Sequence, residues 1–197
     1  MTAFLIRAQQ LLDQTRRLDF LAPLALRLYL VPIFWMAGSH KLADFAGTVE
    51  WFGNADWGLG LPLPGLMAFL ATATELGGSV LLLIGLGVRW VSIPLMVTML
   101  VAIFTVHWPN GWQAIADPGA PFANAQVLAS SEKLAKAKAL LQQYGHYDWL
   151  TSSGPLVVLN NGFEFAATYL IILLSLFFTG AGKYLSLDHW LRRRFME

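Results

Sequence analysis

The sequence contains no cysteine among its 197 residues. It therefore cannot form a disulfide, exchange thiols, attach a c-type haem or hold an iron–sulfur cluster on thiolates. If the protein takes part in redox chemistry, a bound molecule or a partner protein must supply the redox centre. A quinone and copper stay open as cofactors, whereas covalent haem and a cysteine-ligated cluster are excluded.

Charged residues are also scarce, at 13% of the chain, while 56% of the residues are apolar. The mean hydropathy of +0.55 lies far outside the range of an ordinary soluble domain. A net charge of +1 offers no basic surface for nucleic acid, and no glycine-rich loop of the Walker A type is present. We expect an integral membrane protein that has the lipid bilayer, and no nucleic acid, as a partner.

Four apolar runs are long enough to cross a bilayer, which takes roughly 17–25 residues. They cover about 21–39, 66–86, 90–107 and 161–179. The sequence therefore predicts an all-α membrane protein, a four-transmembrane-helix bundle in a single domain of residues 1–197. A long outer loop of about 108–160 would separate the third span from the fourth.

Both ends of the chain have the pattern of a helix lying on a membrane surface. Near the amino terminus, Phe4, Leu5 and Leu11 recur at helical spacing with arginines between them. No small-residue cleavage site is present, so we expect no removable signal peptide and treat the first span as an uncleaved anchor. At the other end, Ser186 can cap an amphipathic helix that continues to Arg194. A frayed, soluble amino-terminal tail is the alternative.

The distribution of Lys and Arg predicts the orientation. One side would carry Arg7, Arg16, Arg17, Arg89, Lys183, Arg192, Arg193 and Arg194, and the other Lys41, Lys133, Lys136 and Lys138. We expect a multi-pass protein of a bacterial inner (cytoplasmic) membrane with both termini in the cytoplasm. The two long loops, about 39–65 and 107–160, would face outward.

The second outer loop has a helix of its own in this interpretation. Ser130 and Ser131 can cap a helix that begins near Glu132 and ends at Gly145. One face of this helix is apolar. It would either pack with neighbouring aromatic residues against the membrane face, as interfacial aromatics often do, or form a docking surface for a peptide.

Two charged residues lie within the apolar runs, where an ionisable group is costly. Counted from the expected outer helix ends, Arg27 lies about 20 Å deep and Glu75 about 14 Å deep, at 1.5 Å per residue. An arginine side chain can span that difference, so we expect an Arg27–Glu75 pair at the polar centre of the bundle. This pair would either fix the helices structurally or bind a quinone or another polar headgroup.

A second polar cluster is expected at the outer rim of the bundle. It comprises His40, Lys41, His107 and Glu164. These groups could protonate a quinone oxygen, hold a metal, or satisfy one another near water, and Lys41 could also extend to the lipid headgroups.

A copper site is a narrower hypothesis at the same level. Thioether and imidazole groups suit Cu(I), and the candidate ligands are Met36, His40, Met67 and His107. Methionine is also ordinary filler in helix packing, which is the alternative interpretation.

Five short motifs follow one another along the chain: RLYL (27–30), AGSHK (37–41), ATELGG (73–78), LIGLGVR (83–89) and GAGKYLSLD (180–188). Together they resemble the DoxX family of small bacterial membrane proteins. The outer segments 133–145, YDW (147–149) and VLNNGFE (158–164) are similar to a narrower branch, the HvfX-type proteins associated with copper-related ribosomally made, modified peptides.

The resemblance implies a four-helix inner-membrane protein encoded beside a peptide precursor and its modifying enzymes. Other DoxX relatives are described as subunits of membrane oxidoreductases, including thiosulfate:quinone oxidoreductase, and as a membrane anchor in a thiol and oxidative-stress complex. Carried over by motif, the residues of interest are Arg27, Lys41, Glu75, Arg89 and Asp188. Arg89 and Asp188 would organise the cytoplasmic helix ends structurally.

Three classes of function remain open, and with them the question whether the protein is an enzyme. The first is an accessory protein in the maturation, anchoring or export of a copper-responsive modified peptide. This function would belong to RiPP maturation and to copper homeostasis. The second is a quinone-linked oxidoreductase subunit that works with a redox partner protein. The third is a structural membrane anchor. Small-residue helix faces would also allow a homo-oligomer.

Overall fold

The computed structural model describes residues 2–196, with side chains from residue 4, and these residues are helical apart from turns and one isolated antiparallel bridge between Ile115 and Leu159. The chain forms two compact units. The first contains the residues up to Thr98 and those from Tyr169 onward, and the second contains Met99–Thr168. We describe each unit by itself. The prediction of a single domain stays a prediction.

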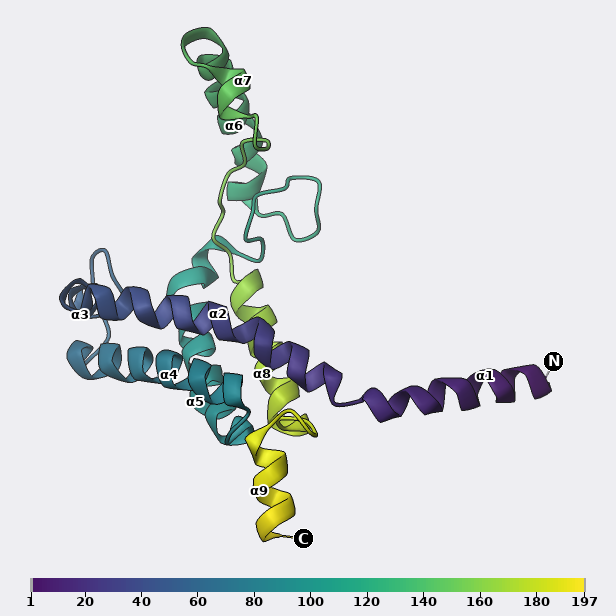
Figure 1. The fold of residues 1–197 in the computed structure, drawn as a ribbon. Coiled ribbons are helices and arrows are strands. Elements are labelled where there is room, and N and C mark those ends of the chain that lie inside the picture. Colours follow the sequence, from purple (N-terminus) through teal and green to yellow (C-terminus); the bar gives the residue numbers. More distant parts are fainter. Residues whose placement is uncertain (1, 197) are drawn as a thin grey trace. The chain divides into compact units, whose positions relative to one another are not determined.

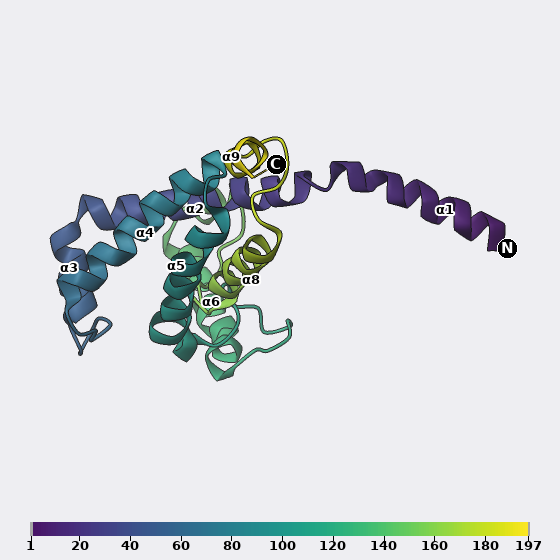
Figure 2. The ribbon, with the colours of Figure 1, turned by 90° about the horizontal axis from the view of Figure 1, so that it is seen from below.

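Helices α2 (Leu21–Ala43) and α4 (Pro64–Ile84) form the centre of the first unit, and Figures 1 and 2 show them lying side by side. Gly38 lets their backbones approach, because a Cβ added there would lie 2.7 Å from Cγ of Leu76. Leu30 and Phe34 of α2 and Leu82 of α4 are buried. The two helices therefore pack antiparallel, with Gly38 level with Leu76.

The link between these two helices contains a helix that the sequence analysis missed, α3 (Phe45–Gly53). It begins at Asp44, whose carboxylate accepts a hydrogen bond from the Gly47 backbone N–H at 3.0 Å. α2 therefore continues to Ala43, one turn beyond the predicted end at residue 39. This extra turn changes the register between α2 and α4.

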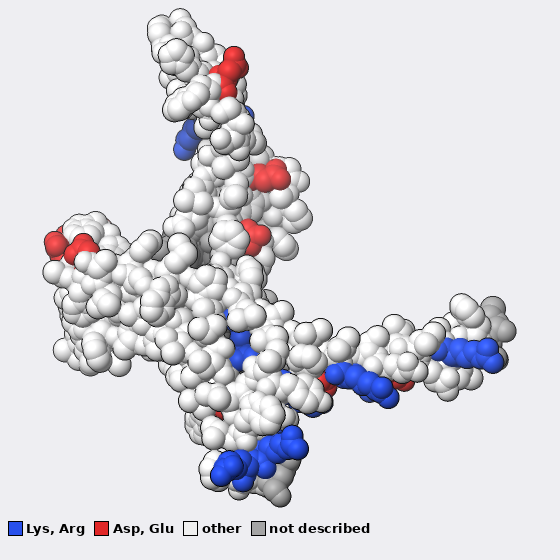
Figure 3. All heavy atoms as spheres, in the orientation of Figure 1, with Lys and Arg blue, Asp and Glu red and all other residues white. Residues whose placement is uncertain are grey.

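Among its described residues, the first unit contains five further helical segments. They are α1 (Thr2–Gln14), a 3₁₀ helix (Thr15–Leu18), the first part of α5 (Val88–Val101), the last part of α8 (Glu164–Thr179) and α9 (Leu187–Phe195). Ser186 caps α9 as predicted, because its Oγ accepts from the His189 backbone N–H at 3.3 Å. On the face shown in Figure 3, Lys and Arg gather along α1 with the 3₁₀ helix that follows it, and on α9.

Among the described residues, three helices are long and apolar enough to cross a membrane, namely Leu21–Ala43, Pro64–Ile84 and Val88–Asn110. The last of these combines α5 with a π-helix (Ala102–His107) and a 3₁₀ turn (Trp108–Asn110). The all-helical class is thus present, with three candidate spans. The fourth predicted span corresponds to α8, which has 16 residues. The four-span count and the interfacial position of the terminal helices stay predictions.

In the second unit, α6 (Ala125–Tyr144) begins earlier than predicted. The side chain of Asn124 caps it by accepting from the Val127 N–H at 2.9 Å, so the predicted start near Glu132 is wrong. Ser130 and Ser131 lie inside the helix, where their hydroxyls donate to backbone carbonyls three residues back. The predicted end at Gly145 is confirmed. A short helix, α7 (Tyr147–Leu150), follows.

The loops of the second unit are held by a buried amide. Asn160 Nδ2 donates to the carbonyls of Asn110 at 2.8 Å and Gln113 at 2.7 Å. Trp108 stacks on Phe163 with ring centroids 5.2 Å apart. Polar contacts and aromatic stacking thus order a segment that the sequence analysis treated as a loop.

Candidate functional site

Two helices of the first unit bury an ion pair between them. Lys41 near the end of α2 donates from Nζ to Glu75 Oε2 at 2.7 Å and to Oε1 at 2.9 Å. The side chain of Glu75 is 6% exposed and that of Lys41 is 23% exposed. Glu75 lies on the buried face of α4 with Thr72 and Ser79. A carboxylate in this setting needs its cation, since an unpaired buried charge is costly.

The predicted Arg27–Glu75 pair is wrong. Because Gly38 is level with Leu76 and the helices are antiparallel, Arg27 lies about twelve residues along α2 from the level of Glu75, about 18 Å along the helix axis at 1.5 Å per residue. That distance is beyond the reach of the side chain. The prediction treated residues 39 and 66 as level ends, which the extra turn of α2 displaces.

Arg27 instead reaches the other end of α4. Its Nη1 donates to the Leu82 carbonyl at 3.1 Å and its Nη2 to the Leu185 carbonyl at 2.7 Å. Leu82 belongs to the last turn of α4, where backbone carbonyls lack helical partners and the helix dipole is negative. The residue is 1% exposed, and its Nε has no hydrogen-bond partner within the described residues. The helix end thus replaces Glu75 as the partner of this cation.

Asp188 ties α9 to the start of α5. Its carboxylate accepts from the backbone N–H groups of Gly87 at 2.7 Å and Val88 at 3.1 Å, and its own N–H donates to the Gly85 carbonyl at 3.0 Å. Gly85 has φ of 69°, and a Cβ there would collide with Nη1 of Arg27. Only glycine fits this turn.

Arg89 also contacts a helix end. Its Nε donates to the Phe177 carbonyl at 2.9 Å, and its guanidinium lies 5.6 Å from the centre of the Phe177 ring. Arg89 and Asp188 thus have the kind of contacts that a structural role requires, and that role itself stays a prediction.

The predicted outer-rim cluster includes residues from both units. The predicted copper site does so too, because Met36, His40 and Met67 belong to the first unit and His107 belongs to the second. Within the second unit, His107 Nδ1 is 2.9 Å from the Asn161 carbonyl and Glu164 Oε2 accepts from the Ala114 N–H at 2.9 Å. Within the first, Lys41 bonds to Glu75. Among the described residues, no group of three or more His, Asp or Glu side chains is arranged to hold a metal. The rim and the copper site stay predictions.

The Lys41–Glu75 pair is the main feature that sequence reasoning missed. A signal for it was present, because Asp44 followed by Gly47 is a helix start and implies that α2 ends at residue 43. Counting depth from there would have brought Lys41 closer to Glu75 and moved Arg27 away from it.

These features define a helical protein whose described residues include three candidate membrane-spanning helices, two of which share an ion pair. Residues 22–108 match the model of the DoxX family. The chain is 36% identical over 83 residues to the "Putative oxidoreductase CatD" of Bacillus subtilis (strain 168), and the match covers 42% of this chain and 58% of that protein. The chain therefore matches less than two thirds of that relative's length. No solved structure matches.

The DoxX match includes Arg27, Lys41, Glu75 and Arg89, whereas Asp188 lies outside it. It ends at Trp108, close to the start of the second compact unit. The polar residues buried at α2 and α4 therefore belong to the family-like part of the chain, and most of the second unit lies beyond it.

Proposed function

We propose that this chain is an accessory inner-membrane protein, with both termini cytoplasmic, in the maturation, anchoring or export of a copper-responsive modified peptide. The observation that carries the proposal is the end of the DoxX match at Trp108, inside a second compact unit, Met99–Thr168, most of which lies beyond the match. An added folded unit on a small membrane protein is a natural contact surface for a partner. The copper and peptide parts rest on the resemblance of segments 133–145, 147–149 and 158–164 to the HvfX-type branch.

The surface of the second unit supports a contact with a peptide. Large apolar side chains are strongly exposed on α6 and α7, among them Leu140 at 59%, Tyr144 at 78% and Trp149 at 75%. Exposed aromatic and aliphatic side chains of this size are the usual anchors of a binding surface. Lysines on α6 add polar groups to the same helix.

The test is a pair of substitutions on this surface in the native host, Leu140→Ser together with Trp149→Ser. Because both side chains are exposed, the variant should stay folded and as abundant as the wild type. We expect peptide maturation or secretion, and copper tolerance, to fall. The matched control is Lys136→Gln, which removes an exposed i,i+4 pair with Glu132 worth only about 0.3–0.5 kcal/mol. Unchanged maturation, secretion and copper tolerance in the double variant would refute the proposal.

A second candidate is a subunit of a quinone-linked oxidoreductase. Two observations favour it: the similarity to a protein named a putative oxidoreductase, and the buried Lys41–Glu75 pair, whose ammonium could donate to a quinone oxygen. Quinone should then co-purify with the wild-type protein and be lost from Glu75→Gln at unchanged abundance. Parallel loss of quinone and abundance would instead favour the structural anchor.

A further inference from the structure

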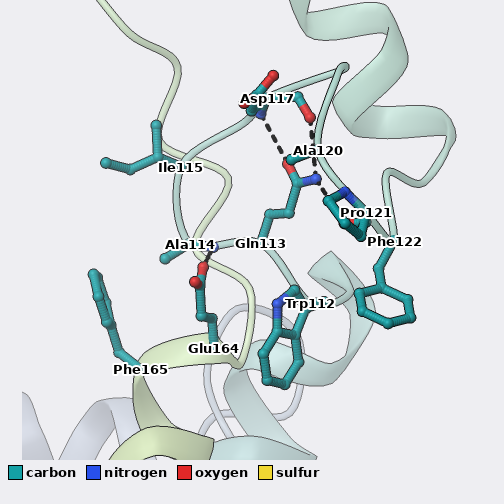
Figure 4. A pocket seen from close by; sticks show the side chains of 10 residues that line it. All are labelled: Trp112, Gln113, Ala114, Ile115, Asp117, Ala120, Pro121, Phe122, Glu164 and Phe165. Atoms are coloured by element: carbon teal, nitrogen blue, oxygen red, sulfur yellow. Dashed lines mark hydrogen bonds between the residues drawn. The ribbon is translucent and has the colours of Figure 1, made fainter.

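The loops of the second unit line an open cavity of about 410 Å³ at the surface, shown in Figure 4. Its walls come from the segment after Gly111 and from the start of α8. The lining residues are Trp112, Gln113, Ala114, Ile115, Asp117, Ala120, Pro121, Phe122, Glu164 and Phe165. The lining is mostly apolar and includes three aromatic rings, and both charged residues among it are acidic. The cavity thus has room for a side chain and a negative charge to hold it.

The polar group of Gln113 is already used within the protein. Its Nε2 donates to the carbonyls of Asp117 at 3.1 Å and Pro121 at 3.2 Å, and its Oε1 accepts from the Asp117 N–H at 2.8 Å. Asp117 in turn accepts from the Gly119 N–H at 2.9 Å through Oδ1. These bonds fix the loop that forms the wall.

Glu164 is the charged group that lies within the cavity. Its Oε2 accepts from the Ala114 N–H at 2.9 Å, which holds the carboxylate in place. Its Oε1 accepts no hydrogen bond from the described residues. In Figure 4 the side chain lies between the rings of Phe165 and Trp112, whereas the carboxylate of Asp117 points away from it. One fixed carboxylate oxygen between aromatic rings is therefore available to a ligand.

We propose that this cavity binds an ammonium group on an apolar stem, presented by a lysine side chain or the amino terminus of a peptide. A carboxylate oxygen attracts the charge, and aromatic faces stabilise both the cation and its stem. An ammonium fits better than a guanidinium, because a planar guanidinium pairs with both carboxylate oxygens and one of them is occupied by Ala114. The peptide as source of the ammonium rests on the proposed function.

The test measures binding of two probes to the full chain in phosphatidylcholine nanodiscs. They are acetyl-phenylalanyl-lysine amide and its neutral match, acetyl-phenylalanyl-norleucine amide. Glu164→Gln removes the charge but keeps an oxygen for the Ala114 N–H, and Asp117→Asn does the same for the Gly119 N–H. We expect Glu164→Gln to weaken binding of the lysine probe at least tenfold and Asp117→Asn to change it less than twofold. The norleucine probe should bind both variants and the wild type equally weakly.

Three outcomes would overturn the proposal. The first is equal binding of both probes to the wild type, and the second is a loss in Asp117→Asn as large as in Glu164→Gln. The third is loss of lysine-probe binding when phosphatidylethanolamine replaces phosphatidylcholine, since a lipid ammonium would then be the occupant. A negative result for ammonium binding in the cavity can be distinguished from a negative result for the proposed function. The Leu140 and Trp149 variant tests the function in the host, whereas Glu164→Gln tests only the cavity.

Discussion

Replacing Lys41 by Met should destabilise the protein more than replacing Glu75 by Gln, although both changes break the same ion pair. Lys41→Met leaves the Glu75 carboxylate buried without its cation. Removing one partner of a buried pair typically costs about 3–5 kcal/mol, because the other charge stays desolvated. Glu75→Gln keeps an oxygen that can accept from Nζ, and the more exposed Lys41 can extend toward water. We expect that change to cost about 1–2 kcal/mol, the range of an imperfect hydrogen bond.

The double variant Lys41→Met with Glu75→Leu removes both charges of the ion pair, and it tests whether the fold needs the pair itself. Neither charge remains, so the stability should return to within about 1–2 kcal/mol of the wild type, since apolar replacements of buried pairs are often neutral or better. Measured against the single variants Lys41→Met and Glu75→Leu, the coupling energy between the two sites should therefore be large and favourable to the double variant, as residues in contact are not additive.

Unfolding can be followed in mild detergent through intrinsic tryptophan fluorescence, with SDS as denaturant, for the wild type and the four variants Lys41→Met, Glu75→Gln, Glu75→Leu and Lys41→Met with Glu75→Leu. The matched control is Lys138→Met on α6, which removes a lysine of the second unit that has no carboxylate within ion-pair distance among the described residues. If Glu75→Gln were more damaging than Lys41→Met, or if the single and double variants were additive, the idea that Glu75 depends on Lys41 would be refuted.

Three further changes test the helix contacts in the same unfolding assay. Arg27→Lys keeps the charge but cannot reach both the Leu82 and Leu185 carbonyls, so it should cost about 1.5–3 kcal/mol of stability. The control Arg16→Lys changes an exposed site and should cost almost nothing. Equal effects of the two changes would refute the bridging role of Arg27. Asp188→Asn leaves one carbonyl oxygen for two backbone N–H groups and should cost about 1 kcal/mol, and no loss would show that the cap is unimportant. Gly38→Ala should cost about 1–3 kcal/mol of stability through overpacking against Leu76. Gly77→Ala meets no neighbour and should be neutral or stabilising by up to about 1 kcal/mol. If Gly77→Ala were the more destabilising of the two, the close approach of α2 and α4 would be refuted.

Composition and apolar run length were sufficient to predict the helical class and the positions of α2, α4 and α5. These features depend on local hydropathy, which a sequence displays directly. The partner of Glu75 was not predictable in the same way, because it depends on the register between two helices. One additional turn at the end of α2 moves the expected level of Arg27 by about 5 Å away from Glu75. The rest of the difference arises because the ends of α2 and α4 are not level, since Gly38 is level with Leu76.

The second unit was harder to predict for a different reason. Its order comes from side chains that bond to distant backbone, such as Asn160 with the carbonyls of Asn110 and Gln113. Nothing in the local sequence indicates which carbonyls an asparagine will find. The start of α6 was missed because both Asn124 and the later serines are suitable N-cap residues. The residues between them form helix well, so the helix begins at the earlier cap, Asn124.

Arg27 and Lys41, the two cations of α2, differ in the chemistry that their partners allow. Arg27 donates to backbone carbonyls, which cannot take up a proton, and an arginine side chain stays protonated in proteins. Lys41 and Glu75 are both groups that can exchange protons and share two hydrogen bonds. If a ligand headgroup enters the α2–α4 pair, proton transfer or hydrogen bonding to it therefore falls to Lys41 and Glu75. Arg27 then acts on the ligand only by keeping the end of α4 in place, so Arg27→Lys should change stability before it changes ligand affinity.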